Sequence, residues 1–284
     1  MSERPYLHFS GISKSFRNAR GIDYPVIKDF DLRIAQGEFV SIIGHSGCGK
    51  STALMMAAGL VPVELGGVIL DNKLVTEAGP DKAVVFQSPS LLPWLSALEN
   101  VLLGADQVYP HAGKKQREAL CEYYLSKVGL GNAFHKMAVD LSNGMKQRVG
   151  IARAFALKPK LLLLDEPFGM LDSLTRADLQ EVLLEIWNTE KITAVMVTHD
   201  VDEALFLSDR VVMMTSGPRA KVGDILSIPF KRPRHKHEVM EHPEYYNYRA
   251  HLIRFLEGTE KKKPGSISSG GDSGTVELLA SARE

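Results

Sequence analysis

A glycine-rich segment at residues 44–51 has the residue types needed to hold phosphate groups. Its sequence, Gly-His-Ser-Gly-Cys-Gly-Lys-Ser, matches G-x-x-x-x-G-K-[S/T] and lies between an apolar run and a helix-like stretch. Glycines allow backbone N–H groups to point at phosphate oxygens, and a helix N-terminus favours negative charge. We predict that Lys50 neutralises the β- and γ-phosphates of a nucleotide and that Ser51 holds Mg²⁺ through its hydroxyl. The predicted ATP-binding loop comprises Gly44, His45, Ser46, Gly47, Cys48, Gly49, Lys50, Ser51 and Thr52.

Two adjacent acids follow a second apolar run, at residues 161–164. A buried strand that ends in Asp165 can place a carboxylate next to a metal ion, so we predict Asp165 as a second Mg²⁺ ligand. The next residue, Glu166, can accept a proton from an attacking water as a general base. The alternative is a core strand capped by solvated acids. The phosphate loop upstream favours the catalytic interpretation.

A histidine follows a third apolar run, at residues 193–197. Open α/β sheets build their sites at the ends of strands, so His199 can reach either the γ-phosphate or the water-activating Glu166. A lone histidine is usually a structural residue. Its position after a strand, downstream of both nucleotide motifs, predicts a catalytic role for His199.

The elements that must position these residues form an alternating pattern. Several apolar runs lack a polar face, as expected for strands that are covered on both sides. Helix-like stretches lie between them, so we predict an α/β fold, a P-loop NTPase core with a mainly parallel sheet. The strands are expected at residues 39–43, 83–86, 161–164, 193–197 and 210–214, and the helices at 50–60, 116–128 and 173–188.

The remaining segments predict two subdomains and an extension. Residues 7–34 and 66–75 resemble short antiparallel strands broken by turns, which indicates an antiparallel β subdomain. A helical subdomain is expected at about 90–158, within an ATPase domain at 5–230. The basic stretch at 231–237 is interpreted as solvated surface, with contact to a partner as the alternative, and it begins a helical extension at 231–257. The Lys-, Gly- and Ser-rich residues 258–284 are predicted to be disordered, and we expect no sensory domain after the ATPase domain.

Bulk composition excludes several classes of protein. The 34 Lys and Arg residues balance 34 Asp and Glu residues, so no nucleic-acid partner is expected. We find no apolar stretch of signal-peptide or membrane-spanning length, which predicts a chain that is soluble by itself. The two cysteines lack metal-binding spacing and fit a reducing, cytoplasmic compartment. Cys48 is interpreted as a small filler of the phosphate loop.

The order of these motifs resembles the ATP-binding cassette (ABC) ATPases of transporters, over about residues 7–218. The segment that decides this is Leu-Ser-Asn-Gly-Met-Lys-Gln-Arg at 141–148, which is similar to the signature of that family. The resemblance implies the fold of an ABC nucleotide-binding domain. It also implies that two cassettes sandwich two nucleotides, with this segment completing the partner's ATP site. The signature residues are Leu141, Ser142, Asn143, Gly144 and Met145.

Two signature positions depart from the family pattern. Asn143 stands where glycine is usual, and Met145 where glutamine is common. Asparagine tolerates left-handed backbone conformations, so we expect Asn143 to keep the turn that a glycine would make. The departures leave the activity of the composite site open.

Other roles follow from the resemblance, position by position. Phe16 resembles the aromatic residue that stacks on adenine, with a core phenylalanine as the alternative, and Val26 is a neighbouring ring or ribose contact. Gln87 resembles the glutamine that senses Mg²⁺ and the attacking water, and it is therefore a predicted catalytic and metal-binding residue. Asp172 resembles the loop that crosses between cassettes. After Gln87, an apolar segment that includes Trp94 could receive a helix of a membrane subunit; a core-facing turn is the alternative.

A narrower resemblance is to importers of nitrate, bicarbonate and cyanate, with taurine and alkanesulfonate importers slightly further away. It implies an ATPase at the cytoplasmic face of the inner membrane, bound to integral permease subunits. A second ATPase subunit, either this chain or a paralogue, and an extracytoplasmic solute-binding protein are the other implied partners. Nitrate is the preferred cargo. A P-loop kinase would leave Gln87, the signature and His199 without roles, and cassettes acting on DNA or ribosomes need a coiled coil or a second cassette.

Overall fold

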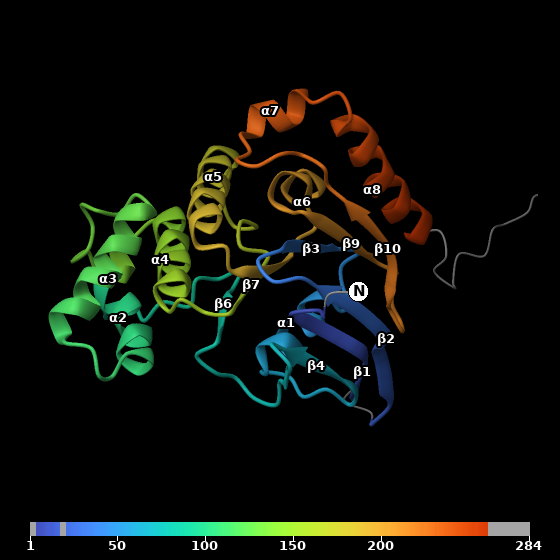
Figure 1. Ribbon diagram of the computed structural model, residues 1–284, viewed down its shortest axis with the longest axis horizontal. Coiled ribbons are helices and arrows are strands. Elements are labelled where there is room, and N and C mark those ends of the chain that lie inside the picture. Colours follow the sequence, from blue (N-terminus) through green and yellow to red (C-terminus); the bar gives the residue numbers. More distant parts are fainter. Residues whose placement is uncertain (1–3, 18–20, 261–284) are drawn as a thin grey trace, which may run out of the picture.

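A six-stranded β-sheet forms the centre of the fold (Figure 1). The computed structural model describes residues 4–17 and 21–260. Five strands are parallel, and β10 pairs antiparallel with β9 at one edge. Every predicted core strand is present. In spatial order the strands are β10 (Val222–Ser227), β9 (Arg210–Met214), β3 (Phe39–Ile43), β8 (Thr193–Val197), β7 (Leu161–Asp165) and β6 (Lys82–Val85).

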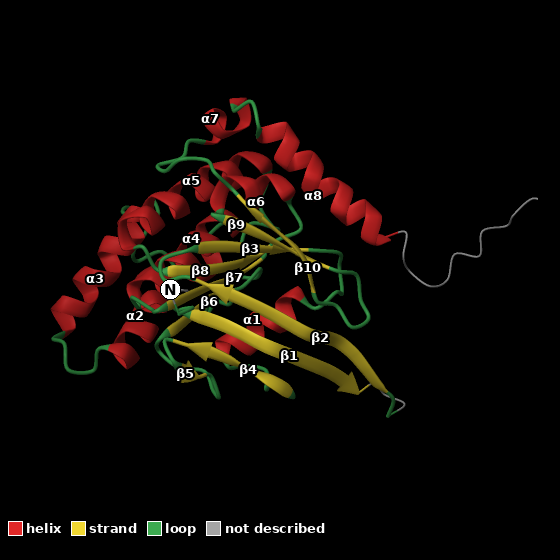
Figure 2. Ribbon diagram, turned by 45° about the vertical axis from the view of Figure 1, so that its right-hand side comes forward, coloured by secondary structure: helices red, strands yellow, loops and turns green. Residues whose placement is uncertain are grey.

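A second, antiparallel sheet packs against α1 (Lys50–Ala58), which lies between the two sheets (Figure 2). The predicted antiparallel β subdomain is therefore confirmed, but its first strands are not short. They are 11 and 12 residues long, and shifts in pairing register interrupt their alternation, so that bulges had the appearance of turns in the sequence. The strands in spatial order are β2 (Asp23–Ile34), β1 (Leu7–Arg17), β4 (Leu65–Leu70) and β5 (Lys73–Leu74).

Alternate side chains of the central strands enter two different hydrophobic cores. One core contains α1 and the antiparallel sheet, and the other contains the remaining helices. Strands buried on both faces explain the unbroken apolar runs in the sequence. On the second face lie the α-helices α2 (Ala97–Val108), α3 (Lys114–Lys127), α4 (Asn143–Ala156), α5 (Ser173–Glu190) and α6 (Val201–Leu207), with a 3₁₀ turn at Ala138–Asp140 before α4.

The helices α2, α3 and α4 pack on one another beside the β6 edge of the sheet (Figure 1). Ser96 begins α2 with a reciprocal cap, in which its hydroxyl accepts from Glu99 N–H and its own N–H donates to the Glu99 carboxylate. These helices occupy most of the predicted helical segment. The boundaries proposed for the domains stay predictions.

After β10 the chain forms α7 (Lys236–Glu241) and α8 (Tyr245–Glu260), which lie over α6 and beside β10 (Figure 1). The predicted helical extension contains both helices, whereas the edge strand β10 was not predicted. The disordered tail was predicted to begin at residue 258, but residues 258–260 belong to the last turn of α8. Residues 261–284, the rest of that predicted tail, lie outside the described part of the chain.

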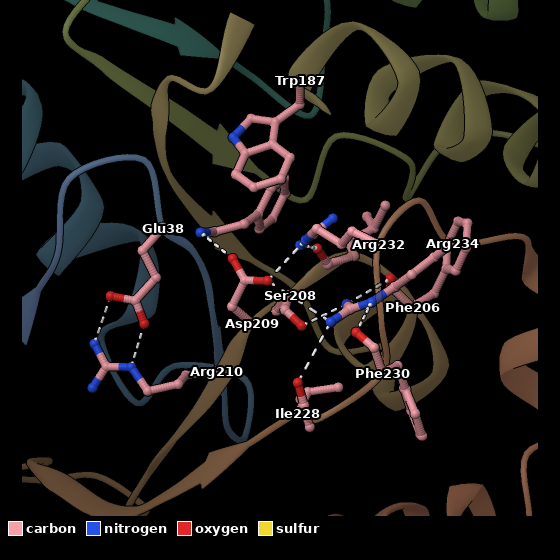
Figure 3. Close-up of polar contacts among 12 residues, drawn as sticks. Glu38, Trp187, Phe206, Ser208, Asp209, Arg210, Ile228, Phe230, Arg232 and Arg234 are labelled. Atoms are coloured by element: carbon pink, nitrogen blue, oxygen red, sulfur yellow. Dashed lines mark hydrogen bonds and ion pairs between the residues drawn. The ribbon is translucent and has the colours of Figure 1, made fainter. Parts of the chain in front are cut away.

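The prediction that residues 231–237 form a solvated surface is wrong for two arginines. Arg234 is 5% exposed and donates to the carbonyl oxygens of Phe206 (3.1 Å) and Ser208 (2.7 Å) (Figure 3). Arg232 lies 4.2 Å from the centre of the Trp187 ring and binds Asp209 at 2.8 Å. The last backbone carbonyls of α6 have no hydrogen-bond donor within the helix. An arginine guanidinium can donate to several of them at once because it carries five N–H groups.

This cluster predicts a large effect of Arg234 on stability. Burial, with the neighbouring Arg232 charge, lowers the pKa of Arg234 to about 10, while Asp209 opposes that shift, so the guanidinium stays charged near neutral pH. We expect Arg234→Ala to lower the free energy of unfolding by about 3 kcal/mol, because buried carbonyls lose their donors. Urea denaturation measures this loss. The exposed neighbour Lys231→Ala is the control, and an equal loss in both variants would contradict the role given to the buried arginine.

No helix within residues 4–17 and 21–260 combines the length and apolar character needed to cross a lipid bilayer.

Candidate functional site

Four of the predicted segments meet at one edge of the central sheet. The strands β3, β6, β7 and β8 are parallel, so their carboxyl ends point the same way. The phosphate loop follows β3, and Gln87 lies two residues after β6. Asp165 ends β7, and His199 lies two residues after β8. This is the edge at which open α/β sheets bind their ligands.

The phosphate loop has the backbone geometry that its glycines predict. Gly49 has a φ of 105°, a left-handed conformation that favours glycine, and a Cβ there would lie 2.8 Å from a methyl carbon of Val26. The predicted contact Val26 therefore lies against the loop. Lys50 is buried, and its Nζ donates to the carbonyls of Gly44 (2.8 Å) and His45 (3.1 Å). The ammonium group is held across the loop where phosphate oxygens would bind.

The other loop residues have distinct environments. Cys48 is buried, and burial raises the pKa of its thiol, which agrees with a space-filling role rather than a reactive one. Its sulfur packs close to Gly44. Ser46 and Gly47 are exposed at the tip of the loop, and Thr52 lies in the first turn of α1.

The two predicted metal ligands contact each other. Ser51 Oγ donates to Asp165 Oδ1 at 2.8 Å. Burial raises the pKa of Asp165, and the hydrogen bond from Ser51 opposes that shift. A hydroxyl and a carboxylate are hard oxygen donors, as Mg²⁺ requires, and Mg²⁺ commonly uses one or two protein groups together with phosphates. The described residues contain no group of three or more His, Cys, Asp or Glu side chains placed to hold a metal ion.

Two side chains converge on one oxygen of Glu166. His199 Nδ1 lies 3.3 Å from Glu166 Oε2, and Gln87 Nε2 donates to the same atom at 3.4 Å. Glu166 has a φ of 45°, and its N–H donates to the carbonyl oxygen of Val197 at 2.9 Å. The side chain of Gln87 passes close to the backbone of Gly169. A Cβ at residue 169 would lie 3.1 Å from Gln87 Nε2, so glycine leaves room for this amide. All three predicted catalytic residues therefore form one cluster.

The signature residues lie elsewhere. Ser142 caps α4 by accepting from Met145 N–H at 3.3 Å, and Leu141 is buried beneath the cap. A Cβ at Gly144 would lie 2.7 Å from a methyl carbon of Thr175, so glycine is needed where α4 meets α5. Helix α4 packs on the face of the sheet opposite to α1. The signature and the phosphate loop of one chain therefore belong to different layers.

The prediction that Asn143 keeps the turn of a glycine is wrong. Asn143 is the first residue of α4 and is absent from the described residues with positive φ. No left-handed turn is required at this position, because Ser142 alone makes the transition into the helix. A helical N1 position accepts asparagine without strain.

Two further predicted contacts are exposed. Phe16 near the end of β1 is 44% exposed, which disagrees with the alternative of a core phenylalanine, and Lys14 Nζ lies 5.4 Å from its ring centre. Asp172 caps α5 by accepting from Thr175 N–H at 3.0 Å, and that bond lowers the pKa of the Asp172 carboxyl.

Two side chains of α4 that the sequence analysis did not single out hold the segment around Gln87. Gln147 is 2% exposed and donates to the carbonyl of Phe86 at 3.1 Å. Arg153 donates to the carbonyl of Pro89 at 3.0 Å. The signal available in the sequence was the position of Gln147, a polar residue at helical spacing among the apolar residues of α4. Through these bonds the signature helix and the Gln87 segment are joined within one chain.

Comparison with known proteins agrees with this arrangement. The family model described as ABC transporter matches residues 27–169, which include the phosphate loop, the signature and Glu166. This chain belongs to the ABC transporter family.

Curated relatives resemble this ABC cassette closely. "Nitrate import ATP-binding protein NrtC" of Synechocystis sp. is 50% identical over 93% of this chain, which spans 40% of that relative's length. "Bicarbonate transport ATP-binding protein CmpD" of the same organism is 48% identical, over 88% of this chain and 89% of the relative. The chain therefore spans nearly the whole length of the CmpD relative but less than half of the NrtC relative.

A solved structure has the same fold. The ATP-binding cassette MJ0796, in a dimeric post-hydrolysis state bound to ADP and Pi, is 30% identical with a TM-score of 0.70. The match covers 79% of this chain and 100% of that one. The chain is thus an ABC ATPase fold with a longer sequence than that cassette.

Proposed function

We propose that this chain hydrolyses ATP as a subunit of an importer for a small anion, with nitrate as the first candidate. The observation that carries the catalytic part is the convergence of Gln87 and His199 on Glu166, beside the Ser51–Asp165 pair. The family of the chain and the names of its relatives support the transport part.

Each residue has a defined task in this proposal. Lys50 binds the β- and γ-phosphates, and the N–H groups of the loop bind the remaining phosphate oxygens. Ser51 and Asp165, with Gln87, would hold Mg²⁺, and the ion would supply positive charge that neutralises the phosphates. Glu166 accepts the proton of the attacking water, while His199 and Gln87 orient the carboxylate. Phe16 and Val26 bind the adenosine part of the nucleotide.

A second cassette completes each site in this proposal. The signature residues, at the start of α4, lie in a different layer from the phosphate loop of their own chain, which supports a role in a partner's site. The dimeric MJ0796 cassette is consistent with such a pair. The partner is a second copy of this chain or a paralogue, and Asp172 lies in the loop that crosses between them.

The permease is proposed to bind beside the Gln87 segment. Trp94 is 67% exposed, whereas Leu91 is partly buried against the core. A groove of about 290 Å³ is lined mainly by apolar residues, among them Leu60 and Phe86, together with the charged Arg153. Gln147 and Arg153 join this segment to α4, so a movement of the signature helix would reach the permease. In this proposal the chain lies at the cytoplasmic face of the inner membrane, and a solute-binding protein acts on the other side.

The cargo is the least constrained part of the proposal. The named relatives handle nitrate in one case and bicarbonate in the other, at 50% and 48% identity. The cassette itself does not touch the cargo in this arrangement, so bicarbonate is kept as the second candidate.

Uptake measurements in a deletion strain test the cargo. We expect loss of this gene to abolish most uptake of labelled nitrate, and a plasmid copy to restore it. A copy with Lys50→Ala should fail to restore uptake, because it lacks the phosphate-binding ammonium. Bicarbonate uptake is measured in the same strains. Loss of bicarbonate uptake alone would assign the second candidate, and loss of neither would reject the importer proposal for both anions.

A further inference from the structure

The C-terminal helix α8 contacts the phosphate loop directly. His45 Nε2 lies 2.7 Å from the carbonyl oxygen of Leu256, and 211 residues separate the two. A carbonyl oxygen only accepts, so Nε2 of His45 carries the proton and donates it. The second residue of the loop is thereby tied to the last part of α8, an extension outside the strands that build the nucleotide site.

His45 links this contact to the phosphate-binding lysine. The backbone carbonyl of His45 accepts from Lys50 Nζ at 3.1 Å and from Cys48 N–H at 3.2 Å. Its imidazole is held by α8 while its carbonyl orients the ammonium group. A shift of His45 would therefore disturb a bond that positions Lys50.

Helix α8 is itself fixed to the core at several points. Its first turns bind Asp202 of α6, through Tyr245 Oη at 2.7 Å and Arg249 Nε at 2.8 Å. Further along, His251 Nε2 lies 2.8 Å from Asp224 Oδ2 of β10. The next residue, Leu252, is fully buried. These contacts run from α6 towards β10 along the helix.

The end of α8 depends on a close approach to β10. A Cβ at Gly223 would lie 2.5 Å from Phe255 Cζ, so only glycine admits this ring. Leu256, whose carbonyl oxygen His45 binds, is the next residue of the helix. The docked helix therefore presents that carbonyl at a set position over the loop.

We propose that α8 is a brace for the phosphate loop and that His45 is the positioning residue through which it acts. When α8 is docked, His45 is held so that its carbonyl orients Lys50, and the loop is ready to bind phosphates before ATP arrives. Preorganisation of this kind raises affinity because less order has to be imposed on binding. The inference rests on the proposed binding of ATP by residues 44–52.

Binding of a fluorescent ATP analogue with Mg²⁺ to the full chain tests the brace. We expect His45→Ala to raise Kd by about three- to tenfold, the factor that one hydrogen bond contributes. His45→Gln should recover most of that loss, because its amide Nε2–H₂ can reach the same carbonyl. In ATPase assays the KM for ATP should rise by the same factor, with kcat changed by less than about twofold.

A variant far from the loop separates bracing from a local effect. Arg249→Ala combined with His251→Ala removes two docking contacts of α8 and should raise Kd to a similar extent, with faster hydrogen exchange of the α8 backbone. Adding His45→Ala to this pair should cause little further loss, because both changes break the same link. Arg254→Ala is the matched control, since this exposed side chain binds Ala250 within α8 itself.

The outcomes distinguish this inference from the proposed function. If the unaltered chain binds no ATP analogue, the proposed function fails. If it binds normally but His45→Ala leaves Kd unchanged, or if the losses from His45→Ala and the α8 pair simply add, the brace is rejected and the proposed function stands. Equal, non-additive losses with recovery in His45→Gln support the brace.

Discussion

Glu166→Gln is expected to retain ATP binding while lowering the steady-state ATPase rate by about 10² to 10⁴. The amide keeps the size and the hydrogen-bonding reach of the carboxylate, so Gln87 and His199 can still contact it. It cannot accept a proton from the attacking water. Phosphate release at saturating ATP measures the rate, and the fluorescent analogue measures binding.

The matched control is Glu181→Gln, an exposed residue of α5 outside the nucleotide site. This variant should hydrolyse ATP at the rate of the unaltered chain. A Glu166→Gln variant with full turnover would remove Glu166 from the role of general base. A variant that neither binds nor hydrolyses ATP would instead indicate that the carboxylate is needed to form the site.

Lys50→Ala is expected to weaken ATP binding by about 10- to 100-fold, which corresponds to the loss of hydrogen bonds from a charged donor. The ammonium is buried and is held by two loop carbonyls at 2.8 and 3.1 Å. No other described lysine is predicted to bind these phosphates, so the charge is not replaced. Titration with the fluorescent analogue measures the change.

Lys114→Ala provides the control, because Lys114 is an exposed lysine of α3 paired with Glu118. Its affinity for ATP should equal that of the unaltered chain. Equal affinities for Lys50→Ala and the unaltered chain would contradict the phosphate-loop assignment. Thermal denaturation of both variants identifies any loss of folding.

The core elements were predictable because their signals are local. An apolar run that is buried on both faces, such as residues 161–165, needs no knowledge of its partners to be recognised as a strand. The phosphate loop is likewise defined by backbone geometry within eight residues, where glycine is needed at Gly49 for its φ of 105°. Parallel strand direction then places the ends of β3, β7 and β8 together.

Errors occurred where a residue's environment depends on distant parts of the chain. Bulges in β1 and β2 resembled turns because alternation breaks in both cases. Arg234 resembled a surface charge, since its sequence neighbours are basic and its acceptors are carbonyls at the end of α6. Asn143 was assigned a special backbone conformation that the capped start of α4 does not need.

The sequence by itself determined the family, the nucleotide motifs and the five parallel strands of the central sheet, because each depends on residue types at short, fixed spacing. Only the tertiary structure decided that Gln87 and His199 meet at one oxygen of Glu166, that Gln147 holds the Gln87 segment, and that His45 binds α8. These contacts join segments from different layers. Their geometry is set by how helices and sheets pack, and packing is a property of the whole fold that no local pattern contains.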